Sequence, residues 1–174
     1  MGKIIFYVAA SLDGMISDEN GGVDWLTPYQ EAGLDYGYTE FYKNIGYIVT
    51  GSKTFEQAKG FPGGWAFPHS ETYIFSSRAL DTMGRKDLIL WKGGIKELAE
   101  QLKKKEKDTW LLGGANLAGQ FINEGQCDEV ILSVMPTVLG RGRPLFDGIK
   151  NPFDLKLKKQ ESFPNGVVQL VYEL

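Results

Sequence analysis

The sequence predicts a three-layer α/β domain, in which helices flank a central mixed, mostly parallel sheet. Short apolar runs alternate with segments whose apolar residues recur at helical spacing, which is typical of strands joined by crossover helices. The first run, Ile4–Ala10, is continuously apolar and so indicates a strand covered on both faces. The last two expected strands lack an obvious helix between them, so we expect an antiparallel edge.

The expected elements follow one another along the whole chain. Strands are expected over Ile4–Ala10, Ile45–Thr50, Thr72–Ser76, Leu88–Trp91, Thr109–Leu112, Glu129–Met135 and Val167–Leu174. Helices are expected near the end of Trp25–Asn44, over Ser52–Ala58, around the stripe of Ile95, Leu98, Ala99 and Leu102, and from Ala115 to Gly125. No repeat or linker divides the chain, so residues 1–174 are expected to form one domain.

Composition narrows the class of protein. A chain of 174 residues with 43% hydrophobic and 24% charged residues resembles an ordinary soluble domain. Its net charge of −3 and pI near 5.3 argue against nucleic acid as a partner. No apolar run is long enough to span a membrane, and the N-terminus lacks a secretory pattern, so we expect a cytoplasmic protein. One cysteine and one histidine exclude an internal disulfide and a Cys/His zinc site within one chain, so no metal is expected.

An apolar run ends at Gly113-Gly114, and a helical pattern starts at once with Ala115-Asn116-Leu117. Glycines let the backbone turn tightly and let a ligand approach bare N–H groups, while the helix directs its positive end at the same place. The pattern G-G-x-x-x-x-G differs from the Rossmann fingerprint, so it indicates an anion site without that fold. A tight turn with nothing bound is the alternative.

Two further loops follow expected strands and carry residues suited to phosphate. Lys53 and Thr54 follow Gly51 at the start of a helix; the spacing does not match a P-loop, and an ordinary helix cap is the alternative. Ser76-Ser77-Arg78 offers hydroxyls and a guanidinium, although a solvated turn explains the same residues. If all three loops lie at one sheet edge, they fit a dinucleotide, and the extra basic group favours NADP over NAD.

Taken together, these motifs resemble the dihydrofolate-reductase-like superfamily, and in particular its riboflavin-biosynthesis branch, the RibD C-terminal domain. The resemblance rests on Ser11–Gly14, Thr50–Glu56, Ser76–Arg78, Gly113–Ala118, Cys127–Val130, Met135–Gly142 and Pro144–Phe146. It implies a mixed sheet flanked by helices, NADPH as the cofactor, and a homodimer. An expected sheet edge near Glu129–Met135 favours the same dimer.

The resemblance also implies roles for individual residues. Lys53 and Thr54 would lie near the adenosine phosphates, and Ser76, Ser77 and Arg78 would lie at the 2′-phosphate. The pyrophosphate would lie at the glycine turn, against Gly113, Gly114, Ala115, Asn116 and Leu117. Asp13 and Gly14 would lie beside the nicotinamide and substrate, and Trp25 with Leu26 would form a mobile cover. Asp13 is the expected catalytic group, with Asp24 a weaker candidate; an Asp-Gly turn is the structural alternative.

Departures from the family pattern concern the substrate. The acid that begins the first helix of folate reductases is missing at Gly37 and Tyr38, with Asp35 and Glu40 out of place, which argues against dihydrofolate. The arginine that folate reductases have at Ser52 is also absent. The riboflavin reductases hold their ribose phosphate with arginine and serine residues after the first loop and have Glu before the double glycine. This chain has no arginine before Arg78 and has Leu112 in place of that Glu.

The remaining candidates are left open or expected to be structural. His69 is expected on the surface, and the acidic neighbours of Cys127 argue against a nucleophile. The aromatics Trp65, Phe67, Tyr36 and Tyr38 suit either the core or stacking on a ligand, and Arg141 and Arg143 suit an anionic substrate or a subunit contact.

The sequence therefore predicts an NADPH-dependent reductase of a small flat heterocycle of pyrimidine or pteridine type, similar to the 5-amino-6-(5-phosphoribosylamino)uracil reductases. Proton supply would come from Asp13 or from water. The alternative is a non-catalytic NADP(H)-binding protein that has lost its substrate contacts.

Overall fold

An eight-stranded sheet with the strand order β5-β4-β3-β6-β1-β7-β10-β9 organises the fold. The structure is a computed structural model that describes residues 1–30 and 32–174. The strands are β1 (Ile4–Ser11), β3 (Ile45–Gly51), β4 (Glu71–Phe75), β5 (Leu88–Trp91), β6 (Asp108–Gly113), β7 (Glu129–Met135), β9 (Lys156–Ser162) and β10 (Val168–Glu173). The first six of these pair in parallel, as predicted.

The antiparallel edge is also confirmed, because β10 pairs antiparallel with both β7 and β9. The outer strand β9 was not predicted. All of its residues are exposed, so it lacks the apolar alternation by which a strand is detected. Strand β7 is the third strand from this edge, so β10 and β9 separate Glu129–Met135 from the edge itself, and the dimer stays a prediction.

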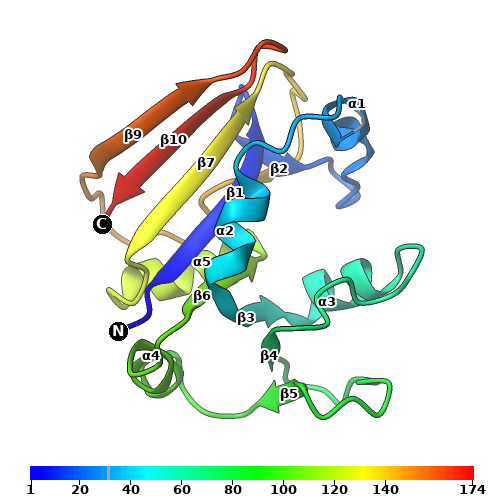
Figure 1. Cartoon of the computed structure of the whole chain (residues 1–174), viewed down its shortest axis with the longest axis vertical. Helices are drawn as coiled ribbons and strands as arrows, with labels where there is room; N and C mark the ends of the chain where they lie inside the picture. The colour runs from blue at the N-terminus through cyan, green and yellow to red at the C-terminus, as the bar shows by residue number, and fades with distance from the viewer. Residues whose placement is uncertain (31) are drawn as a thin grey trace.

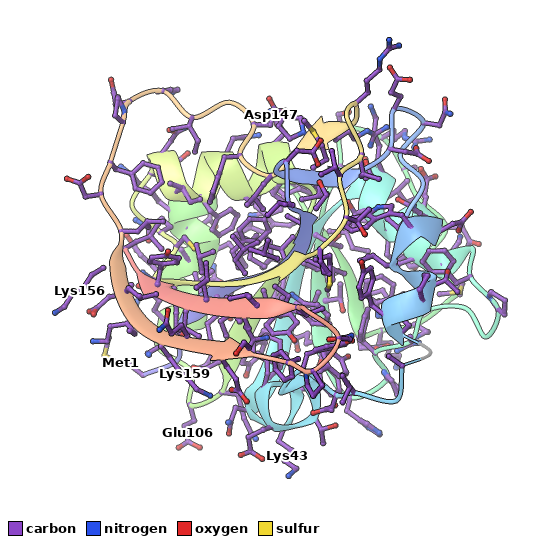
Figure 2. The ribbon with its side chains drawn as sticks, turned by 90° about the horizontal axis from the view of Figure 1, so that it is seen from above. Met1, Lys43, Glu106, Asp147, Lys156 and Lys159 are labelled. Atoms are coloured by element: carbon purple, nitrogen blue, oxygen red, sulfur yellow. The ribbon has the colours of Figure 1, made fainter. Side chains whose placement is uncertain are left out.

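Helices cover both faces of the sheet, which confirms the predicted layers. These helices are α2 (Tyr38–Asn44), α3 (Ser52–Lys59), α4 (Ile95–Lys103) and α5 (Ala115–Asn123). Figure 1 shows α2 crossing in front of the sheet, and Figure 2 shows the sheet nearly edge-on, with α5 above it and Lys43 of α2 below it.

Alternation along the strands fills a separate core on each face. On β6, Leu111 joins the core under α4 and α5, whereas its neighbour Trp110 joins the core on the opposite face with Phe55 of α3. The same alternation places Val49 and Ile48 of β3 in the two cores. The period of two along each strand therefore builds both interfaces.

Smaller elements complete the chain on the side where the parallel strands end. They are β2 (Met15–Ser17), which pairs antiparallel with β8 (Arg143–Pro144), the 3-10 helix η1 (Asp24–Leu26) and the short helix α1 (Thr27–Gln30). None of these was predicted, because they are too short to show periodicity. No helix within the described residues has the length and apolar character needed to cross a membrane.

Candidate functional site

A cavity of about 1010 Å³ lies at the carboxyl ends of the central parallel strands. Its floor includes Tyr7, Val8 and Ala9 of β1, and its walls come from the first turns of α3 and α5 and from the β2–β8 pair. Open α/β sheets bind ligands at this end of their strands, and the volume is at the upper end of that of small-molecule sites. We refer to it as the large cavity.

Two helix N-termini meet at the large cavity. Helix α3 starts after Gly51 and α5 starts after Gly114, and no side chain caps either helix. Residues 51–54 and 114–117 all line the cavity. Because the first N–H groups of a helix have no partner within it, two uncapped helix starts form a strong site for an anion.

The glycine pair allows the two helix starts to approach each other. Gly113 has φ +107°, a conformation that favours glycine. At Gly114, an added Cβ would lie 3.3 Å from Oγ1 of Thr54, closer than most such contacts. The buried hydroxyl of Thr50 donates to the Gly113 carbonyl at 3.1 Å and so ties the ends of β3 and β6 together.

Cations line the same cavity. Lys53 and Arg143 both line it, and neither forms an ion pair within the described residues. Asp147 is the acidic residue in the lining, and Figure 2 shows it on the α5 side of the sheet. Two cations beside two helix N-termini favour a ligand with more than one negative charge.

A second chamber of about 420 Å³ opens beside the large cavity, and we call it the tyrosine chamber. It shares Tyr7, Ala9, Leu26 and Gln30 with the large cavity, so the two spaces are adjacent. Its lining is Tyr7, Ala9, Leu26, Tyr29, Gln30, Leu34, Asp35, Tyr36, Tyr38, Ser133 and Met135. Flat aromatic and apolar walls suit a planar ring.

Hydrogen bonds hold the wall of the tyrosine chamber in place. The carbonyl of Tyr36 accepts from the Tyr7 hydroxyl at 3.3 Å and from Nε2 of Gln169 at 2.8 Å. The Tyr29 hydroxyl bonds Oγ1 of Thr137 at 2.6 Å. Burial raises the pKa of Tyr38 to about 12 and also raises the pKa of Tyr7, so both phenols are neutral at neutral pH.

Comparison with known proteins identifies the family. The chain matches the family model of the RibD C-terminal domain over residues 2–169. This protein belongs to the RibD C-terminal domain family. It is 34% identical to the uncharacterized protein YwjB of Bacillus subtilis over 171 residues, which cover 98% of this chain and 97% of that protein.

Solved structures agree on the fold. The crystal structure of a Shewanella sp. PV-4 protein matches with a TM-score of 0.87 and 25% identity over 99% of this chain and 98% of that one. A dihydrofolate reductase from Enterococcus faecalis, solved with NADP(H), matches with a TM-score of 0.65 and 18% identity over 99% of this chain and 96% of that one. This chain therefore has a dihydrofolate-reductase-like fold.

The residues expected at a 2′-phosphate lie outside the wall of the large cavity, which reaches only Phe75 at the end of β4. Arg78 pairs with Glu56 of α3, and the Ser76 hydroxyl donates to the Arg78 carbonyl at 2.8 Å. Lys92 donates to the Ser76 carbonyl at 3.0 Å and adds a cation that the sequence did not indicate. The role of Ser76, Ser77 and Arg78 stays a prediction.

Asp13 is exposed and lies outside the lining of both spaces. Hydrogen bonds from the Ser11 hydroxyl at 2.6 Å and the Leu139 and Gly140 amides, at 3.1 and 2.7 Å, lower the pKa of Asp13 to about 2. Asp13 is thus ionised at neutral pH and has no proton to donate. Gly14 forms the turn with φ +79° and likewise lies outside both linings.

Trp25 and Leu26 occupy the 3-10 helix η1, where only Leu26 lines the cavities. Nε1 of Trp25 is buried and has no hydrogen-bond partner within the described residues. Within this helix, Leu26 therefore lines the site in place of Trp25. Sequence alone cannot decide which of two adjacent apolar residues faces a cavity from so short a helix.

Other sequence candidates divide between core and site. Tyr36 and Tyr38 line the tyrosine chamber, whereas Trp65 and Phe67 pack in the core with Trp110. Burial raises the pKa of Cys127 to about 12, which fits a structural thiol.

Several lining residues were missed or left undecided by sequence reasoning. Arg143, left open between ligand and subunit contact, lines the large cavity, and Asp35, set aside as out of place, lines the tyrosine chamber. Gln120 and Asp147 also line the large cavity. Of these residues, only Gln120 could be indicated by the sequence, because it lies in the helix that follows the glycine turn.

Proposed function

We propose that this protein is an NADPH-dependent reductase that acts on a small flat heterocycle of pyrimidine or pteridine type. The observation that carries the proposal is the meeting of two uncapped helix N-termini, each starting after a glycine, at one cavity lined by Lys53 and Arg143. A dinucleotide has the charge and the length that this arrangement suits.

The chain offers a fitting cradle for such a cofactor. The amides at the starts of α3 and α5 would hold its phosphates, because Gly51 and Gly114 leave them uncovered. Ser76, Ser77 and Arg78 would hold the 2′-phosphate, with Glu56 giving up its present bond to Arg78. Bound NADPH would supply a hydride to an electron-poor carbon of the substrate.

The tyrosine chamber is the proposed substrate site, because it shares Tyr7, Ala9, Leu26 and Gln30 with the large cavity. A ring between these walls would lie next to the end of the cofactor, and the phenol of Tyr38, which burial keeps neutral, could donate a hydrogen bond to it. Since the ionised Asp13 holds no proton at neutral pH, the proton required for reduction would come from water.

Two measurements test the proposal. Energy transfer from the four tryptophans reports titrations with NADPH and NADH, and NADPH consumption is then followed with a panel of pyrimidines and pteridines. We expect NADPH to bind more tightly than NADH. Lys53→Gln should weaken both by about fivefold, and Arg78→Ala should weaken NADPH alone, because a charge-assisted hydrogen bond to phosphate is lost.

Lys59→Gln is the matched control, since Lys59 lies at the other end of α3 and pairs with Asp81. It should leave both affinities unchanged. Absence of binding by either nucleotide would refute the proposal. Tight binding without consumption of NADPH on any panel member would instead support the non-catalytic alternative.

A further inference from the structure

The tyrosine chamber has a one-sided charge. Among its described lining residues, Asp35 carries the sole ionisable carboxylate, and no lysine, arginine or histidine is present. The cations Lys53 and Arg143 line the large cavity and are absent from the chamber lining. Asp35 is exposed and belongs to the chamber lining.

The neighbouring helix adds no free cationic side chain. Helix α2 begins at Tyr38, and the Asp35 carboxylate already accepts from the N–H of Thr39 at 3.1 Å and from its hydroxyl at 2.8 Å. The lysine of that helix, Lys43, pairs with Glu40 at 3.0 Å. An anion entering here would therefore meet a carboxylate and neutral phenols.

We propose that the tyrosine chamber selects an uncharged or cationic ring that bears no phosphate. The inference rests on the proposed function, which assigns this chamber to the substrate. Transferring a phosphate dianion out of water without a cation to receive it is unfavourable, and Asp35 adds repulsion. The two spaces would thus bind groups of different charge: the large cavity would hold anionic groups, and the tyrosine chamber would hold a ring without phosphate.

The test compares chemically matched probes with and without negative charge. Uridine is paired with uridine 5′-monophosphate, and uracil with orotate, and binding is measured by ligand-observed saturation-transfer NMR and calorimetry. Titrations are run with saturating NADP⁺, which occupies the large cavity, and again without it. We expect the uncharged member of each pair to bind at least tenfold more tightly.

Substitution of the carboxylate assigns the preference to the chamber. Asp35→Asn removes the charge and keeps a side chain that can cap α2, so it should narrow the gap within each pair by about fivefold. Glu40→Gln is the control: it removes an exposed charge from α2 that does not line the chamber, and it should leave the gap unchanged.

Equal or tighter binding of the phosphorylated or anionic probes would overturn the inference, as would an unchanged gap in Asp35→Asn. Binding of none of the probes would also overturn it. These failures differ from failure of the proposed function. If NADP⁺ does not bind but the charge preference persists, the cofactor assignment fails; if NADP⁺ binds and phosphate is tolerated, only the chamber's selectivity fails.

Discussion

Substitution of Gly119 by alanine sets helix propensity against packing at a position beside the proposed cofactor site. Gly119 lies inside α5, where alanine favours the helix by about 0.5–1 kcal/mol over glycine. In the structure, an added Cβ would lie 2.1 Å from the carbonyl oxygen of Asp147, more than an ångström inside ordinary contact at 3.4 Å. The two effects have opposite signs.

The packing effect should win. The contacted atom belongs to the backbone, and its loop is tied to α5 because Asn123 donates to the Gly148 carbonyl at 2.8 Å and accepts from the Lys150 amide at 3.0 Å. Overpacking of this kind costs about 1–3 kcal/mol. After the helix gain, Gly119→Ala should destabilise the protein by about 1–2 kcal/mol. For a chain of this length, that lowers Tm by about 4 °C.

Thermal and urea unfolding of wild type and Gly119→Ala measure the effect. Gly94→Ala is the control, because Gly94 precedes α4 with a negative φ and has no atom within 4 Å of an added Cβ. Because Gly94 is the N-cap of α4, where alanine is less favourable than glycine, the control should cost about 0.5 kcal/mol and no more. A Tm for Gly119→Ala equal to or above that of wild type would refute the described packing of α5 against the Asp147 loop.

Three further predictions follow from single contacts. Thr50→Val should destabilise the fold by about 1–3 kcal/mol in urea unfolding, because the Gly113 carbonyl loses its buried donor; an unchanged midpoint would contradict that bond. The pKa of Asp13 lies below its unfolded value of 3.8, so its carboxylate stabilises the fold above pH 3.8, and this contribution disappears as the pH falls towards 2. Asp13→Asn should remove that part of the pH dependence of the free energy of unfolding. An unchanged pH profile would argue against the loop contacts of Asp13. Native Cys127, whose pKa is about 12, should resist a thiol reagent at pH 8 until the protein unfolds, whereas rapid labelling would contradict its burial.

Periodicity predicted the elements that bury side chains. The six parallel strands were found as short apolar runs, because both of their faces are covered, and the longer helices were found because apolar residues recur along one helix face. Strand β9 has no such pattern, since its lysines and glutamate face solvent and it is held by backbone bonds to β10. A strand that buries nothing gives almost no signal in a single sequence.

The site was predictable where backbone conformation dictated residue type. The Gly113-Gly114 turn and the helix after it predicted an uncapped N-terminus, and both line or adjoin the large cavity. Arg143 lies in the two-residue strand β8 and Asp35 in a loop, and the course of both segments depends on tertiary contacts, so sequence could not place their side chains. Asp13 shows the opposite case: the motif was visible, but its carboxylate is engaged by Leu139 and Gly140, which are distant in sequence.

In the proposed function, the N-termini of α3 and α5 bind the phosphates of NADPH. Amide ¹H–¹⁵N NMR of the protein titrated with NADP⁺ tests it at those groups directly. We expect the largest chemical-shift changes to fall on the amides of residues 52–54 and 115–117 and to saturate together. Saturable binding that leaves these amides unshifted would contradict it.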